Sequence, residues 1–254
     1  MMTIFQCQDS TDGIFSGVYD AWASKLGHRN IRLQLTENIN FELFADYTLV
    51  PVDGEKAEKV ARTLRNRLGE EDYYHIYQAT LACDTGKADS IYRTIVAGLC
   101  TAPGSSVMQN LLHPDICKVF ELSRTIGNEA HRYLGFLRFR ELEHKVLFSE
   151  IHPEGNILPL IGNHFADRYP GEHFLIYDSG RQLFLAHEAY KQWALVEGET
   201  LNTEKMQCFS EQEMQFQRLW QRFTRSIAIK ERCNKKLQQQ MLPLKFRAYM
   251  TEYE

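Results

Sequence analysis

The first hundred residues alternate between short β-like runs and longer segments with helical periodicity. Runs that are rich in β-branched or aromatic residues and alternate in polarity predict strands at residues 3–8, 31–36 and 44–52. Apolar residues that recur every three or four positions predict helices at residues 11–26, 55–68, 71–83 and 87–99. This part of the chain is therefore expected to be a small α+β region.

The run TAPGSS at residues 101–106 interrupts this pattern. Proline, glycine and serine together are typical of a loop or linker. We therefore predict a domain boundary here, with an N-terminal α+β region over residues 1–104 and a C-terminal domain over residues 105–254. The C-terminal domain is expected to begin with a helix at residues 107–132, kinked at Pro114 and Gly127.

At Leu134 the period changes to strict alternation. Two alternating runs (LGFLRFR and KVLFSEI) around a polar turn predict a β-hairpin at residues 134–140 and 145–151. A helix capped by Asn156 and running to about Asp167 follows, and alternation then predicts strands at residues 174–178, 182–187 and 193–197. The order β-β-α-β-β-β with flanking helices indicates an antiparallel sheet packed by helices, so the fold class is α+β.

Helical periodicity returns at Ser210. The apolar residues of this first C-terminal helix can line one broad face; they are Met214, Leu219, Trp220, Phe223 and Ile227. We expect this face to dock on the domain, with the arginines of the helix lying to the side. A second helix is predicted at residues 230–240, and Pro243 ends it.

Charge is distributed unevenly along the chain. The 254 residues contain 29 Lys and Arg and 33 Asp and Glu, yet residues 218–247 hold nine basic residues and one acid, Glu231. A concentrated basic segment on an otherwise acidic protein indicates a polyanionic partner. The alternative is a basic helix face that only contacts solvent.

Several function classes lack their signatures. The six cysteines form no CxxC pair, which argues against a zinc ribbon or a local iron–sulfur cluster and favours reduced thiols. No apolar run is long enough for a membrane span and no signal-like segment is present, so we expect a cytoplasmic protein without membrane association. No GxSxG, P-loop or GxGxxG motif occurs, and no other motif indicates which cofactor, if any, the protein binds.

Polar residues gather at the predicted strand ends and turns of the second half. Six of the nine histidines lie between residues 131 and 187. The catalytic candidates, as a general acid–base pair or a metal site, are His131, His164, Asp178 and His187. Their spacing fits no standard metal signature, and the alternative is that the histidines cap and stabilise turns.

Arg138 and Arg140 stand at i and i+2 of a predicted strand and would share a face suited to phosphate groups, with Leu137 and Phe139 turned to the core. The alternative is ion pairs with acids of the same hairpin. The predicted nucleic-acid-binding residues are Arg138, Arg140, Arg168, Arg181, Arg232, Asn234, Lys235 and Lys236.

Three stretches carry a resemblance: HRYLGFLRFREL (131–142), HFADRYPGEHFLIYDSGRQLFLAH (164–187) and FTRSIAIKERCNKKLQQQMLPLKFRAYM (223–250). Together with the opening FQCQDSTDGIFSGVYDAWAS (5–24), they make the chain resemble a bacterial family described as DNA repair or DNA metabolism proteins, whose core is a domain of unknown function. The family's usual RENxxLQ reads here with Cys233 in place of the acid.

The resemblance implies work on DNA. Genes of this family usually stand beside one for a radical S-adenosylmethionine protein, and in other lineages the domain is fused to a uracil-DNA glycosylase-like domain. The leading hypothesis is therefore a nucleic-acid-binding accessory to a radical S-adenosylmethionine partner. The alternatives are an enzyme that acts on nucleic acid through the His/Asp cluster, and a scaffold whose acidic N-terminal part docks a partner protein.

Overall fold

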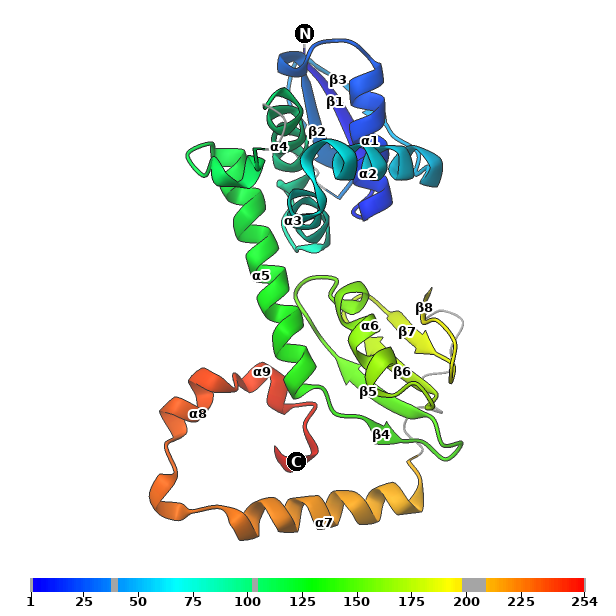
Figure 1. Ribbon diagram of the computed structural model, residues 1–254, viewed down its shortest axis with the longest axis vertical. Coiled ribbons are helices and arrows are strands. Elements are labelled where there is room, and N and C mark those ends of the chain that lie inside the picture. The colour runs from blue at the N-terminus through cyan, green and yellow to red at the C-terminus, as the bar shows by residue number, and fades with distance from the viewer. Residues whose placement is uncertain (1, 38–40, 102–104, 198–208, 254) are drawn as a thin grey trace. The chain divides into compact units, whose positions relative to one another are not determined.

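The computed structural model describes residues 2–37, 41–101, 105–197 and 209–253 (Figure 1). The chain forms two compact units. Unit 1 comprises Met1–Asn128 with Glu154–Asn156, and unit 2 comprises Glu129–Pro153 with Ile157–Glu254. The units therefore divide further along the chain than the boundary predicted at residues 101–106, and residues 102–104 of that run lie outside the described residues.

Unit 1 contains a three-stranded parallel sheet with the order β2-β1-β3. Its strands are β1 (Met2–Cys7), β2 (Ile31–Leu35) and β3 (Ala45–Leu49). Its helices are α1 (Thr11–Ala23), α2 (Gly54–Leu68), α3 (Glu70–Leu81) and α4 (Lys87–Cys100), and short 3-10 turns occur at His28–Asn30 and Val107–Gln109. Every strand and helix predicted before residue 100 is confirmed.

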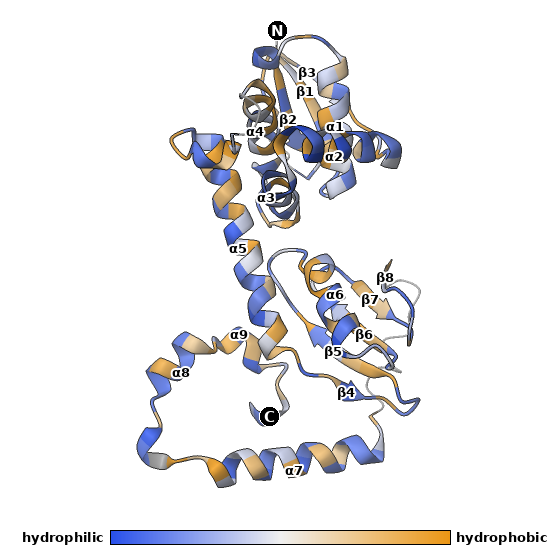
Figure 2. Ribbon diagram, in the orientation of Figure 1, coloured by the Kyte–Doolittle hydropathy of each residue, from blue (hydrophilic) through white to orange (hydrophobic). Residues whose placement is uncertain are grey.

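Local signals explain where these helices begin and end. The side chain of Ser10 accepts from the backbone N–H of Gly13 at the start of α1, and that of Asp53 accepts from two N–H groups at the start of α2. Gly69 follows α2 with φ 92°, a conformation that favours glycine. The apolar residues of these helices and strands, coloured orange in Figure 2, contribute to one buried core.

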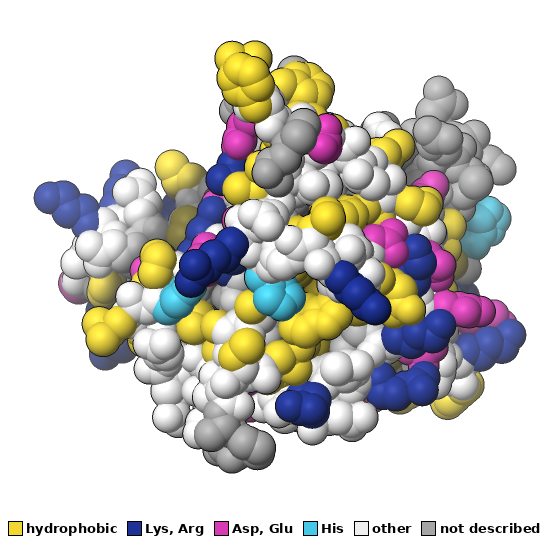
Figure 3. Space-filling view, turned by 90° about the horizontal axis from the view of Figure 1, so that it is seen from above, with side chains coloured by type: hydrophobic (Ala, Val, Ile, Leu, Met, Phe, Trp, Pro, Cys, Tyr) yellow, Lys and Arg dark blue, Asp and Glu magenta, His cyan; other side chains and the backbone are white. Residues whose placement is uncertain are grey.

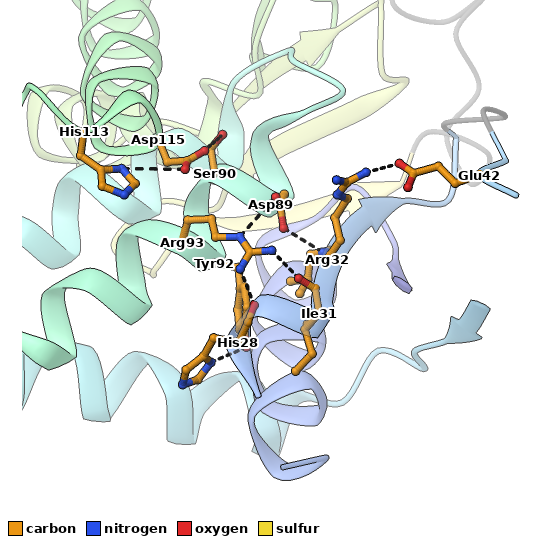
Figure 4. A network of polar contacts seen from close by, with 11 residues as sticks. His28, Ile31, Arg32, Glu42, Asp89, Ser90, Tyr92, Arg93, His113 and Asp115 are labelled. Atoms are coloured by element: carbon orange, nitrogen blue, oxygen red, sulfur yellow. Dashed lines mark hydrogen bonds and ion pairs between the residues drawn. The ribbon is translucent and has the colours of Figure 1, made fainter. Parts of the chain in front are cut away.

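A polar network fastens α4 to the edge strand β2 (Figure 4). The guanidinium of Arg93 donates to the backbone oxygens of His28 and Ile31, and Asp89 accepts from the backbone N–H of Leu33 at 3.1 Å. The hydroxyl of Tyr92 lies 2.8 Å from Nδ1 of His28. Burial raises the pKa of Asp89, and the positive charge of Arg93 offsets part of this rise. We interpret this network as structural.

Helix α5 (Pro114–Phe136) begins in unit 1 and ends in unit 2. Three expectations are wrong here. Pro114 is the first residue of α5, where its missing N–H costs nothing, and the helix continues without a break past Gly127. The strand predicted from Leu134 is helical as far as Phe136, because the last turn of α5 packs on Phe246, with ring centroids of Phe136 and Phe246 5.1 Å apart.

Unit 2 contains a five-stranded sheet in sequential order. Its strands are β4 (Arg140–Glu141), β5 (Leu147–Ile151), β6 (Phe174–Asp178), β7 (Leu183–His187) and β8 (Ala194–Glu197), and α6 (Leu158–Arg168) follows β5. The α+β class and the order β-β-α-β-β-β are confirmed. The sheet is mixed rather than wholly antiparallel, because α6 returns the chain so that β6 runs parallel to β5.

Two details of this region differ from expectation. Asn156 does not cap α6: the N-cap position is Ile157, without a side-chain bond. The backbone N–H of Asn156 donates instead to the oxygen of Leu81 at 2.9 Å. On the inner face of α6, Leu158 and Ile161 are fully buried and Phe165 is 4% exposed.

The C-terminal segment consists of one long helix followed by shorter helices and 3-10 turns. They are α7 (Glu211–Ile227), a 3-10 turn (Lys230–Arg232), α8 (Lys235–Met241), α9 (Leu244–Arg247) and a 3-10 turn (Thr251–Tyr253). The single helix predicted at residues 230–240 is thus divided at Cys233 and Asn234. No described helix has both the length and the apolar character needed to cross a membrane.

The expectation that α7 docks through its apolar face is wrong. Trp220, Phe223 and Ile227 are 43%, 52% and 58% exposed. The half-buried positions of α7 are polar ones, and Gln221 donates to the backbone oxygen of Thr251 at 3.0 Å. Helix α7 thus contacts the C-terminal 3-10 turn through a polar edge and leaves its apolar stripe in solvent.

Candidate ligand pocket and basic surface

A pocket of about 510 Å³ lies in unit 2 between α6 and the connection from β7 to β8. Its polar and aromatic lining residues are Asn163, Asp167, His187, Tyr190, Lys191, Gln192 and Trp193. Of the predicted catalytic residues, only His187 lines it.

His187, the last residue of β7, is 5% exposed. Its Nδ1 lies 2.9 Å from the backbone oxygen of Glu172. A carbonyl oxygen can only accept, so Nδ1 carries the hydrogen and Nε2 of the neutral ring is left as an acceptor. The ring also stacks on Phe174, with centroids 4.5 Å apart at 18°. The imidazole at the pocket wall therefore has a defined tautomer and orientation.

Trp193 is held against α6. Its indole Nε1 donates to Oδ1 of Asn163 at 2.7 Å, which leaves the Nδ2 hydrogens of Asn163 for other acceptors. The ring lies over Gly162, where an added Cβ would come 2.6 Å from Cε2 of Trp193. Glycine at position 162 is thus what allows the indole to lie at this wall.

Tyr190 occupies the rim in a strained conformation, with φ 61°. Its backbone N–H donates to the oxygen of Pro170 at 2.7 Å, and its hydroxyl would lie 3.1 Å from a Cβ added at Gly171. The ammonium of Lys191 pairs with Glu188 at 2.8 Å, and this hydrogen bond lowers the pKa of Glu188. The positive charge at the rim is thereby already balanced.

The structure does not bring the four predicted catalytic residues together. In the antiparallel β6–β7 pair Phe174 faces His187 and Asp178 faces Leu183, so Asp178 and His187 stand at opposite ends, roughly 13 Å apart along the strands. His131 and His164 are exposed and do not line the pocket. Within the described ranges, no group of three His, Cys, Asp or Glu is placed to hold a metal ion.

The carboxylate of Asp178 forms hydrogen bonds that stabilise the turn after β6. It is fully buried and accepts from the backbone N–H groups of Gly180 and Arg181 in the turn after β6. Nη1 of Arg181 completes the arrangement, 3.1 Å from Asp178 and 3.2 Å from the backbone oxygen of Pro153. Arg181, a predicted phosphate contact, is thus engaged in fastening the ends of β5 and β6.

The expected pairing of Arg138 and Arg140 on one strand face is wrong. Arg138 precedes β4 and pairs with Glu252 at 3.0 Å, whereas Arg140 lies in β4 with its guanidinium 5.5 Å from the ring centre of Phe209. Leu137 is buried as expected, and Phe139 packs edge-on against Phe165. The hairpin strand is too short to align the two arginines.

The remaining predicted nucleic-acid-binding residues differ in their surroundings. Arg168 lies over the ring of Tyr169, 5.7 Å from its centre. Asn234 caps α8 by accepting from the backbone N–H of Leu237 at 3.1 Å. Arg232, Lys235 and Lys236 are exposed and form no ion pair with any part of the chain that the structure describes.

Helix α7 adds three more exposed cations, Arg218, Arg222 and Arg225, also without an ion pair among the described residues. Their spacing places them on one side of the helix, since about 3.6 residues make a turn. Phe216, whose side chain is 67% exposed, and the ring pair Trp220 and Phe223 lie on the other side. By contrast, basic and acidic side chains are interspersed on the face drawn in Figure 3.

Asn163, Tyr190 and Trp193 were not among the residues predicted from the sequence. They line one pocket only because α6 packs against the β7–β8 connection. Asn163 lies far from Tyr190 and Trp193 in sequence, so no local pattern joins them. Gly162 and Gly171 are sequence features that could have indicated this site, because a glycine often stands where another side chain packs closely against the backbone.

Comparison with known proteins places the chain in a family. The family model for the domain of unknown function DUF4130 matches residues 85–252, and the chain belongs to that family. The comparison with curated proteins gave no match. Among solved structures, the DHH domain of a member of a family of ribosomal proteins is similar, at 12% identity over 74% of each chain, with a TM-score of 0.35. That likeness is too low to support an argument.

Proposed function

We propose that this protein binds nucleic acid through exposed cations of its C-terminal segment and acts as an accessory protein in DNA metabolism. The observation that supports this is a set of exposed cations without ion pairs among the described residues: Arg218, Arg222, Arg225, Arg232, Lys235 and Lys236. We call this set the basic surface.

The physical argument concerns what a cation without a carboxylate partner can do. The chain as a whole has an excess of acids, yet these side chains form no ion pair within the described part of the structure. Lys and Arg that meet phosphates release condensed counterions, which favours binding and requires no particular base sequence. Several of them are carried by helices, which limits the backbone order lost on binding.

The test is nucleic-acid binding by the triple variant Arg232→Glu, Lys235→Glu, Lys236→Glu, measured by fluorescence anisotropy with labelled single and double strands across a range of salt concentrations. Loss of three phosphate contacts should lower the slope of log affinity against log salt by about 2–3. Folding stability should change by under about 0.5 kcal/mol, because these side chains are exposed and form no ion pair with the described residues.

The matched control reverses three exposed arginines of unit 1, Arg29, Arg62 and Arg67, so that net charge changes equally. If the control weakens binding as much as the C-terminal variant, the effect is one of net charge and the basic surface is not the binding site. Binding that is unchanged in the folded C-terminal variant would contradict the proposal directly.

A protein partner is the second candidate function, and the exposed apolar stripe of α7 favours it. Phe216, Trp220 and Phe223 are all more than 40% exposed. The resemblance implies a radical S-adenosylmethionine protein as that partner. Co-purification with this protein, lost in a Phe216→Ser, Phe223→Ser variant and retained in the basic-surface variant, is the expected result. Retention in both would contradict docking on this stripe.

A further inference from the structure

We propose that the pocket beside His187 binds a single nucleobase, either in a free nucleoside or unstacked from a strand. The second form rests on the proposed function, and the first does not. The pocket is built rather than incidental: a nearly buried imidazole with a defined tautomer, a tethered indole and a strained tyrosine surround about 510 Å³.

The volume suits such a ligand. Pockets for small molecules usually measure roughly 300–1,000 Å³, and this one lies in the middle of that range. By comparison, the hollow of similar volume in unit 1 has a lining in which apolar side chains of α1, α2 and α4 predominate, including Val18, Val60 and Ile95.

The hydrogen-bonding groups of the pocket point to a ligand that donates and accepts. Nε2 of His187 and the carboxylate of Asp167 accept. Asn163 donates through Nδ2, because its oxygen is already used by Trp193. The edge of a nucleobase offers N–H donors beside carbonyl or ring-nitrogen acceptors, which is how extruded bases are read in other proteins. The side-chain amide of Gln192 can donate or accept. The two acceptor-only groups, His187 Nε2 and the Asp167 carboxylate, favour bases with an exocyclic amino group.

The charges argue against an anion as the ligand at the centre of the pocket. Lys191 is paired with Glu188, and Asp167 brings a negative charge to the lining. A phosphate would therefore meet repulsion without a free cation among the described lining residues to offset it. A neutral base avoids this cost.

Two aromatic side chains can stack on the ligand. The Trp193 ring lies over Gly162, where an added Cβ would come 2.6 Å from it. The Tyr190 ring is 85% exposed at the rim, with its hydroxyl next to Gly171. Stacking on aromatic rings is the common means by which proteins hold single bases, because every base has a π face. The strain at Tyr190 is consistent with a rim residue held in place for binding.

The experiment measures binding of guanosine, adenosine, cytidine and thymidine to the full chain by titration calorimetry. We expect the three amino-bearing nucleosides to bind more tightly than thymidine. His187→Asn keeps a donor for Glu172 and deletes the acceptor at the Nε2 position, so it should weaken binding by roughly tenfold or more. Asn163→Asp keeps the acceptor for Trp193 and removes the donors, with a similar loss expected.

The control is His164→Asn, which changes an exposed histidine of the same helix outside the pocket lining and should bind as the parent does. Asn163 is exposed, so Asn163→Asp carries the test if His187→Asn does not fold. No binding at millimolar nucleoside, or equal binding by the parent and both pocket variants, would overturn the proposal.

Oligonucleotide titrations separate this inference from the proposed function. If the basic-surface variant loses binding to strands but still binds nucleosides as the parent does, the result supports both the proposed function and the pocket proposal. If the pocket variants also weaken binding of a short single strand, the ligand is a base within a strand; if they do not, it is a free nucleoside. Absence of nucleoside binding while the basic-surface variant still loses strand binding overturns the pocket alone.

Discussion

The guanidinium of Arg138 binds the carboxylate of Glu252, with Nε and Nη2 3.3 and 3.0 Å from the same oxygen. The two residues are 114 positions apart, and their contact fastens the C-terminal 3-10 turn beside the end of α5. Lys245 adds a second tie to α5 through Glu129, at 3.2 Å. Two ion pairs near the C-terminus thus hold the C-terminal segment against the end of α5 within unit 2.

Replacing Arg138 with alanine should lower the free energy of unfolding by about 1–2 kcal/mol, because it leaves the largely buried carboxylate of Glu252 without its cation. Denaturant unfolding measures this. Nucleic-acid affinity and its salt dependence should not change, since Arg138 is already paired. A reduced salt slope in a folded Arg138→Ala variant would instead restore this arginine to the phosphate-binding set.

Trp220→Ala should change stability by less than about 1 kcal/mol, because the indole remains 43% exposed. Ile161→Ala on α6 removes a fully buried side chain and should cost about 2–5 kcal/mol. Thermal unfolding of the two variants side by side checks the contrast. If both variants lose stability equally, α7 is packed through its apolar face.

Lys87 is 2% exposed and donates to Asp9 and to the backbone oxygen of Ala82, each at 2.6 Å. Lys87→Ala should destabilise the protein by about 2–4 kcal/mol, since it removes the partner of Asp9 and opens a cavity. The exposed Lys59, changed to alanine in parallel, should cost less than about 0.5 kcal/mol. Equal losses would contradict a structural role for the Lys87–Asp9 pair.

The cysteines should differ in reactivity. Cys83, Cys100 and Cys233 are exposed, whereas Cys7 is buried and burial, followed by the charge of Asp9, raises the pKa of its thiol to about 12. A thiol reagent at neutral pH should modify the exposed cysteines of the native protein and reach Cys7 only after unfolding. Mass mapping of the modified peptides shows the order, and early modification of Cys7 would contradict it.

The same thiol makes stability depend on pH. The folded state keeps the Cys7 proton up to about pH 12, whereas the unfolded chain releases it near 9.0, so the contribution is complete below pH 9 and is lost as the pH rises towards 12. Each pH unit in this window should cost up to about 1.4 kcal/mol. Between pH 9 and 10, the free energy of unfolding of Cys7→Ala, measured with urea, should fall less than that of the parent. Burial also raises the pKa of Tyr77, Tyr92 and Tyr133, and their contribution is lost mainly above pH 10 in both proteins.

The sequence alone determined most helices and strands, the α+β class and the basic C-terminal segment. Periodicity, caps and charge are properties of neighbouring residues: Ser10 and Asp53 begin their helices through atoms within three positions, and Gly69 ends α2 by its own conformation. Such signals can be read along the chain because the interactions that produce them are local.

Tertiary structure decided the features that join distant residues. Leu134 and Phe136 alternate like a strand but remain helical because Phe246, more than a hundred positions away, covers the end of α5. Only the fold separates Asp178 from His187 by the length of a strand pair, and only the fold places His187 beside Asn163 and Trp193. Contacts of this kind depend on how the helices and strands pack, which the local sequence pattern does not specify.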